Sequence, residues 1–200
     1  MDWYEDEVKR VEEEKRKLSY TPRVVFYGSS SINLWPEIYV NFRAFDPVNL
    51  GFGGSTLESC VWYFERILTG LEPEHILCYA GDNDLGDGKT AEEVILYFQQ
   101  LMDLLKKHFP AAMFSFISIK PSTARWHLID KIKKVNQHAE ETLKKAGNNY
   151  YYVDIFDRML GKDGKPVVDL LQQDGLHLSA RGYALWQEIL LTHLHETRVS

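Results

Sequence analysis

Small polar and titratable residues gather in four short segments of this 200-residue chain, which are Gly28–Ser31, Asn49–Ser55, Gly81–Asp84 and Asp174–His177. Acyl transfer by an activated serine needs a nucleophile, a base, a group that orients the base and donors for the developing oxyanion. The four segments contain side chains of all these kinds. Ser30 is a candidate nucleophile because it lies in a predicted strand-to-helix turn, although a serine there is more often only a helix cap.

A nucleotide site fits the same region less well. Gly88-Lys89-Thr90 resembles the end of a phosphate-binding loop, but the position at which that loop needs its first glycine holds Asn83. The dinucleotide pattern that could start at Gly51 also fails, because it requires glycine where this chain has Thr56. Nucleotide binding is therefore disfavoured.

A calcium loop is a second alternative. Asp82, Asp84 and Asp87, with Glu93 eleven positions after the first, partly imitate the ligand spacing of an EF-hand. However, Asp87 stands where the sharp turn of that loop requires glycine, and Gly86 stands where an oxygen ligand belongs. Glu93 also suits a capping box at the start of the next helix. We therefore expect an acidic turn and no metal site.

The elements that must position these segments follow from hydrophobic periodicity. The predicted strands are Arg23–Gly28, Pro47–Gly51, His75–Gly81, Met113–Ile119 and Tyr150–Asp154. The predicted helices between and after them are Thr56–Leu68, Thr90–Phe109, Leu128–Ala146 and Ser179–Leu194. This alternation indicates a parallel sheet covered by helices on both faces. Ligands bind such sheets beyond the carboxyl ends of the strands, where the first three segments lie.

The composition is that of a globular protein, with 44% hydrophobic and 26% charged residues. The net charge of −6 offers nucleic-acid phosphates no attraction, and no apolar run is long enough to span a bilayer. Two cysteines are too few for a disulfide framework, and the charged start lacks the apolar core of a secretory signal. We expect a cytoplasmic protein with no nucleic-acid partner and no stable membrane insertion.

Residues 2–18 form a predicted helix with Glu and Lys on nearly every face, so we expect it on the surface rather than in the core. It could dock on its own domain or on a second chain, which would make a homo-oligomer. We divide the chain into this charged helix, residues 1–20, and a single domain, residues 21–200.

Taken in order, the four segments resemble the sequence blocks of the SGNH, or GDSL-type, esterase and lipase superfamily. They read FYGSSS from residue 26, NLGFGG from 49, GDND from 81 and DGLHLS from 174. The resemblance covers roughly residues 23–195 and is greatest to the branch with platelet-activating factor acetylhydrolase-like proteins. It implies a flavodoxin-like, three-layer αβα fold with five parallel strands.

The resemblance also implies a role for each matching residue. Ser30 becomes the nucleophile, His177 the base and Asp174 the partner of that base. Ser30 and Gly54 become backbone donors of the oxyanion hole, and Asn83 becomes its side-chain donor. A turn at Asp174 can place its carboxylate near Nδ1 of a histidine three residues later, so the spacing agrees with these roles.

Several residues rival these assignments. The first block of the family usually reads Gly-Asp-Ser, and Ser29 replaces the aspartate here, which makes Ser29 and Ser31 rivals of Ser30. Asp154 and Asp157 are rival partners for the base, although a capping or turn role is commoner for such residues. Trp62, Trp126 and Trp186 are candidates to line a substrate pocket, although aromatic residues at helical positions more often pack in the core or on the surface. Lys120, at the end of the fourth predicted strand, is a candidate to shape the acyl or leaving-group pocket.

The sequence thus predicts a serine hydrolase that cleaves carboxylic esters through an acyl-serine intermediate. Its substrate would be a small-molecule ester, such as a small acyl ester, a lysophospholipid or an acetylated carbohydrate. No metal ion or organic cofactor is expected. The alternative is a non-catalytic module that binds a small ligand or carbohydrate on the same fold.

Overall fold

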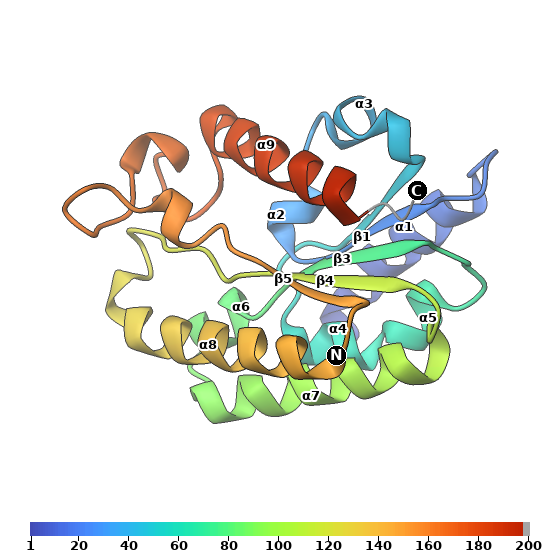
Figure 1. Cartoon of the computed structure of the whole chain (residues 1–200), viewed down its shortest axis with the longest axis horizontal. Coiled ribbons are helices and arrows are strands. Elements are labelled where there is room, and N and C mark those ends of the chain that lie inside the picture. Colours follow the sequence, from blue (N-terminus) through green and yellow to red (C-terminus); the bar gives the residue numbers. More distant parts are fainter. Residues whose placement is uncertain (198–200) are drawn as a thin grey trace.

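A computed structural model describes residues 1–197, with a five-stranded parallel sheet at its centre (Figure 1). The strands are β1 (Val24–Gly28), β2 (Pro47–Gly51), β3 (His75–Tyr79), β4 (Met113–Ile117) and β5 (Tyr150–Val153), in the spatial order β2-β1-β3-β4-β5. All five predicted strands are present, and β3, β4 and β5 end slightly earlier than predicted. The expected flavodoxin-like order and parallel direction are confirmed.

Helices cover both faces of this sheet (Figure 1). They are α1 (Glu5–Arg16), α2 (Ser30–Asn33), α3 (Ile38–Asn41), α4 (Leu57–Trp62), α5 (Phe64–Leu68), α6 (Asp82–Gly86), α7 (Ala91–His108), α8 (Ile129–Ala146) and α9 (Ala180–Thr197). One apolar cluster joins the sheet to α1, α4, α5, α7 and α8, and another joins it to α2, α3 and α9. None of the described helices is long and apolar enough to cross a membrane.

The three layers follow from the way β1 is buried. Val25 and Tyr27 belong to one apolar cluster, and Val24 and Phe26 belong to the other. Because successive side chains of a strand point to opposite faces, a strand covered on both sides must be apolar at every position. This is why β1 reads as a continuous apolar run in the sequence.

The N-terminal helix is more deeply integrated than predicted. Val8 and Val11 are fully buried, and Tyr4, in the short 3₁₀ helix (Asp2–Tyr4) before α1, is buried as well. These residues are four and three positions apart, so they share one side of the helix and join the apolar cluster on its face of the sheet. The expectation of a helix outside the core was wrong, because one narrow apolar stripe is enough to dock it.

Two histidines and a serine form a polar cluster at the edge where the strands begin. Ser115 Oγ lies 2.7 Å from His75 Nε2 and 2.6 Å from His193 Nε2. Burial lowers the pKa of His75 to about 3, with a smaller contribution from the charge of His193, and it lowers the pKa of His193 to about 4. Both imidazoles therefore stay neutral in the folded protein in mild acid.

This cluster predicts that the free energy of unfolding falls as the pH is lowered from about 6.5 to about 4. Histidines in the unfolded chain bind protons near pH 6.5, whereas the folded rings do not, so the unfolded state is favoured in that window. Each ring contributes about 1.4 kcal/mol per pH unit. Burial raises the pKa of Asp84 to about 6. Below that pH the folded protein therefore binds a proton at Asp84 that the unfolded chain does not, and this offsets the contribution of one of the two histidines to the slope. Urea unfolding at several pH values measures the slope.

His193→Gln provides the matched comparison, because glutamine can still hydrogen-bond to Ser115 but does not titrate. The slope should decrease by about 1.4 kcal/mol per pH unit in this variant. Identical slopes in the two proteins would show that His193 already binds a proton in the folded state.

Candidate active site

The loops that follow β2, β1 and β3 start side by side at the carboxyl edge of the sheet. Gly28 ends β1 and is in register with Gly51 of β2 and Tyr79 of β3. A Cβ atom on Gly28 would lie 2.0 Å from the carbonyl oxygen of Tyr79, and the residue has a φ of +130°. Only glycine fits this close approach, and it lets the chain turn directly into α2.

Ser30 is the first residue of α2, and its neighbours decide which of the three serines is accessible. Ser29 and Ser31 are each only 2% exposed, whereas Ser30 is partly exposed. The backbone N–H of Ser29 donates to the carbonyl of Tyr79 at 2.9 Å, which fixes the turn against β3. Within residues 1–197, neither the hydroxyl nor the backbone N–H of Ser30 makes a hydrogen bond.

Gly54 follows β2 and has a φ of +69°. The N–H groups on either side of it are occupied, since Gly53 donates to Glu7 at 2.9 Å and Ser55 donates to the carbonyl of Phe52 at 3.3 Å. The N–H of Gly54 itself has no hydrogen-bond partner in the described part of the chain, and a Cβ atom there would meet nothing within 4 Å. The N–H of Gly54 is thus available to a ligand, and the residue is exposed.

Asn83 lies in α6 and is held by both ends of its amide. Its Nδ2 donates to the carbonyl of Ser55 at 3.0 Å, and its Oδ1 accepts from Nη2 of Arg125 at 3.0 Å. The first contact joins Asn83 to the residue after Gly54, and one N–H of the amide remains unbonded among the described residues. The sequence alone gives no signal for the contribution of Arg125.

Asp82, Lys120 and Arg125 form a buried ionic cluster next to Asn83. Asp82 is 3% exposed and lies 2.7 Å from Lys120 Nζ and 2.7 Å from Arg125 Nη1. Burial opposes ionisation of Asp82, but the two cations outweigh it and lower the pKa of its carboxyl. The interpretation of Lys120 as a pocket-lining residue was wrong, because its ammonium group is buried against Asp82 and the hydroxyl of Tyr79.

The other acidic residue of this turn has a different structural role. Asp84 accepts hydrogen bonds from the backbone N–H groups of Leu57 at 2.6 Å and Glu58 at 3.3 Å, so it caps the start of α4. Glu93 completes the predicted capping box with Thr90. Asp82, Asp84 and Glu93 are thus engaged with separate protein partners, and no group of three metal-ligating side chains occurs among the described residues.

Asp174 and His177 form the predicted pair. Nδ1 of His177 lies 2.6 Å from Oδ2 of Asp174, whose Oδ1 accepts from the backbone N–H groups of Leu176 at 2.9 Å and of His177 at 3.0 Å. The hydrogen bond from His177 is the main cause that lowers the pKa of Asp174 to about 2, so the carboxylate is ionised at neutral pH. Nε2 of His177 makes no hydrogen bond within residues 1–197, to Ser30 or to any other group.

The loop that carries this pair is tied to the segment after β4. The carbonyl of Gly175 accepts from Thr123 Oγ1 at 3.2 Å and from the N–H of Ala124 at 3.1 Å. Gly175 has a φ of +66°, and a Cβ atom there would lie 2.2 Å from Thr123 Oγ1. Since Arg125 in the same segment bonds to Asn83, one stretch of chain connects the histidine loop to α6.

The rival residues have other roles. Asp154 accepts from the N–H groups of Phe156 at 2.8 Å and Asp157 at 3.3 Å, so of the capping or turn role suggested for it the turn role is confirmed. Trp186 is fully buried in the core, while Trp126 is partly buried in a 3₁₀ helix before α8. Of these three tryptophans, Trp62 lines a cavity described below, and it is 70% exposed.

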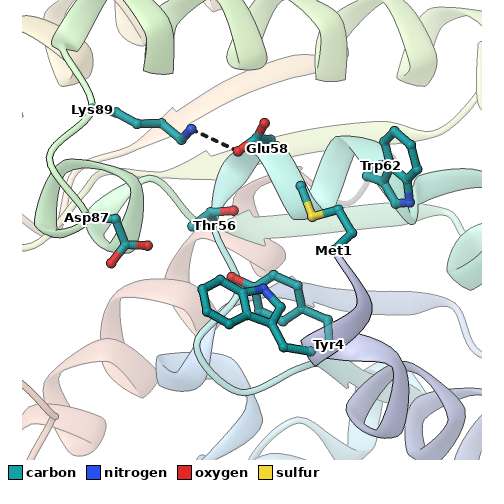
Figure 2. Close-up of a pocket in the computed structure, with 8 residues that line it drawn as sticks. Met1, Tyr4, Thr56, Glu58, Trp62, Asp87 and Lys89 are labelled. Carbon is teal, nitrogen blue, oxygen red and sulfur yellow. Dashed lines mark ion pairs between the residues drawn. The ribbon is translucent and has the colours of Figure 1, made fainter.

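That cavity has a volume of about 690 Å³ and lies between the N-terminus, α4 and the end of α6 (Figure 2). Its lining residues are Met1, Trp3, Tyr4, Thr56, Glu58, Trp62, Asp87 and Lys89. Figure 2 shows Trp62 and Met1 toward one end and Asp87 toward the other, with the ion pair between Lys89 and Glu58 along one side. Ser30, Asn83 and His177 do not line it.

Comparison with known sequences identifies the family of this site. Residues 22–185 match the GDSL-like Lipase/Acylhydrolase family. This range includes Ser30, Gly54, Asn83, Asp174 and His177. A comparison with curated proteins finds no match.

Solved structures share the fold over most of the chain. A Streptococcus pneumonia protein provisionally described as a platelet activating factor is 21% identical with a TM-score of 0.83, and 96% of this chain and 95% of the other are covered. A GDSL-like lipase from Bacteroides thetaiotaomicron VPI-5482 is 20% identical with a TM-score of 0.79 and coverages of 96% and 98%. A carbohydrate esterase family 3 protein from Talaromyces cellulolyticus is 15% identical with a TM-score of 0.72 and coverages of 86% and 96%. These likenesses establish the three-layer fold.

Proposed function

Because the chain belongs to the GDSL-like lipase/acylhydrolase family and is a carboxylic ester hydrolase, we propose that it cleaves small-molecule esters through an acyl-serine intermediate on Ser30. His177 acts as general base and general acid, and Asp174 orients and stabilises it. The N–H groups of Ser30 and Gly54 and the amide of Asn83 stabilise the oxyanion.

The reaction proceeds in two halves. Ser30 Oγ attacks the ester carbonyl carbon while its proton passes to Nε2 of His177, and the carbonyl oxygen becomes an oxyanion. The tetrahedral intermediate collapses as His177 delivers the proton to the leaving alcohol. A water molecule then attacks the acyl-serine with the same proton transfers, and the carboxylic acid is released.

One observation carries this proposal. The donors that the mechanism requires have no hydrogen-bond partner among the described residues: the N–H of Ser30, the N–H of Gly54 and one N–H of Asn83. Neighbouring donors in the same loops, such as Gly53 and Ser55, are occupied. Unpartnered donors from three adjacent loops are the expected arrangement of a preorganised oxyanion hole.

The fixed orientation of His177 supports the same mechanism. Because Nδ1 faces the Asp174 carboxylate, Nε2 is the nitrogen that can accept the proton of a serine hydroxyl. Catalytic hydrogen bonds are often long in the absence of substrate and tighten when it binds. We therefore assign the contact between Ser30 and His177 to the substrate complex.

Because Gly54 is exposed, the carbonyl oxygen of an ester can approach it from solvent. The substrate classes predicted from the sequence all present such a carbonyl: small acyl esters, lysophospholipids and acetylated carbohydrates. A screen of p-nitrophenyl esters from acetyl to palmitoyl distinguishes short from long acyl groups.

Covalent labelling tests the proposal against a non-catalytic binding module. A fluorophosphonate should label one residue, Ser30, and peptide mass spectrometry should locate the adduct. A protein that turns over no ester and gains no adduct would instead be a binding module on the same fold.

A further inference from the structure

Two charged residues of α1 hold the loop that carries Gly54. Oε2 of Glu7 accepts the hydrogen bond from the N–H of Gly53 at 2.9 Å. Nη2 of Arg10 donates to the carbonyl of Gly51 at 3.0 Å. The helix that the sequence places outside the domain thus contacts the backbone directly before the candidate oxyanion donor.

Two further contacts extend this attachment. The hydroxyl of Tyr4 donates to the carbonyl of Gly54 at 3.1 Å, so both peptide groups next to the N–H of Gly54 are held by the N-terminal segment. Nη2 of Arg10 also donates to Oδ1 of Asn33 at 2.7 Å. Because Asn33 ends α2, which begins at Ser30, one guanidinium group links the oxyanion loop to the short helix of the nucleophile.

The loop depends on such outside contacts. Gly51, Gly53 and Gly54 restrict the backbone little, so sequence alone does not fix the direction of each N–H. The bonds the loop makes outside α1 lie mainly at its two ends, where Phe52 donates to Gly28 and Ser55 donates back to Phe52. The peptide plane between residues 53 and 54 is therefore positioned chiefly by α1.

The negative charge of Glu7 is paired with the positive charge of Arg10 beside the loop. Its pKa is lowered, first by the hydrogen bond from Gly53 and then by Arg10, whose Nη2 lies 3.1 Å away. The ionised carboxylate is a stronger acceptor for the N–H of Gly53 than a neutral group would be. The nearby guanidinium group limits the repulsion that this carboxylate would exert on an oxyanion.

We propose that Glu7 and Arg10 are positioning residues of the ester hydrolase, which hold the loop Gly51–Gly54 so that the N–H of Gly54 faces the oxyanion. This inference rests on the proposed function of Gly54. It assigns α1 a role in the reaction although none of its side chains touches the substrate.

Glu7→Ala should lower kcat for p-nitrophenyl acetate by about 10- to 100-fold, less than the loss expected for complete removal of one donor. KM should change by less than about twofold, because the oxyanion bond is made mainly in the transition state. Glu7→Gln should recover most of kcat, since its amide oxygen can still accept from Gly53. Affinity for phenylboronic acid, which forms a tetrahedral anionic adduct with serine, should fall in parallel with kcat.

Glu12→Ala is the matched control. Glu12 lies on the same helix and binds Arg66 at 2.8 Å, away from the loop. This variant should keep the kcat of the parent protein, and its melting temperature measures how far the loss of an ion pair on the same helix destabilises the fold. If Glu7→Ala does not fold, Tyr4→Phe tests the same attachment, with an expected kcat loss of about threefold to tenfold.

Equal kcat losses in Glu7→Ala and Glu12→Ala would overturn the inference, because the helix would then act only through stability. A change confined to KM, or no recovery in Glu7→Gln, would overturn it too. Unchanged kcat in Glu7→Ala while Ser30→Ala is inactive would reject the role of Glu7 and leave the serine mechanism standing. Full activity in Ser30→Ala would reject that mechanism instead.

Discussion

Ser30→Ala should abolish ester hydrolysis, lowering kcat by roughly 10⁴- to 10⁶-fold, because the variant has no nucleophile to form the acyl intermediate. Its stability should change by no more than about 0.5 kcal/mol, since the hydroxyl makes no hydrogen bond within residues 1–197. Turnover of p-nitrophenyl acetate measures the first effect, and urea unfolding measures the second.

The neighbouring serines provide the controls for this experiment. Ser29 and Ser31 are buried, so alanine at either position should leave most of the activity in place. If Ser30→Ala kept its turnover while one of these variants lost it, the neighbouring serine would be the nucleophile. Full activity in all three would contradict the serine mechanism.

The strands and long helices could be predicted because their signals are local. β1 is covered on both faces and reads as a continuous apolar run, and α7 is amphipathic with a capping box formed by Thr90 and Glu93. Helices α3 and α6 escaped prediction, and α2 was expected only as a turn into a helix without bounds, because one turn of helix is too short to show a period. The predicted helix Thr56–Leu68 divides at Tyr63 into α4 and α5.

The docking of α1 shows the limit of composition as a guide. Charged residues dominate Glu5–Arg16, and their number hides the two valines that enter the core. A charged side chain can still lie at the rim of a buried stripe, where Arg10 and Glu7 find backbone partners. Those partners are more than forty residues away in sequence, and no local pattern identifies them.

The contacts of the candidate site also differ in how far they could be predicted from sequence. Asp174 and His177 are three residues apart, so their contact follows from a turn and could be predicted. Asn83 and Arg125 are 42 residues apart, and they meet only because β3 and β4 are neighbours in the sheet. Residues that do chemistry could thus be predicted from their types and order, whereas the groups that orient them depend on the tertiary structure.

Arg125 strengthens the hydrogen bond that the side-chain amide of Asn83 can donate. Its guanidinium group binds Oδ1 of the amide and pairs with buried Asp82, so the cation is held in place. A positive charge at the amide oxygen withdraws electron density from Nδ2 and strengthens the hydrogen bond that its N–H can donate. Asn83 should therefore be an effective oxyanion donor.

Asn83→Ala should lower kcat by roughly 10²- to 10³-fold, the scale for the loss of one oxyanion-hole donor. KM should change little, because the missing bond forms mainly in the transition state. Steady-state kinetics on p-nitrophenyl acetate separates the two constants. The variant should also lose some stability, since the contacts with Ser55 and Arg125 disappear.

The pH dependence of the same variant separates a lost donor from a disturbed base. In the parent protein, kcat/KM should rise along one acid limb, because a general base must be unprotonated to accept the serine proton, and the Asp174 carboxylate is already ionised because its pKa is about 2. Asn83 carries no titrating proton, so Asn83→Ala should lower the whole profile and leave the limb at the same pH. A shifted limb would mean that the substitution had moved the histidine loop through Arg125 and the adjoining segment. A variant with near-normal kcat would remove Asn83 from the mechanism and make it a turn residue of α6.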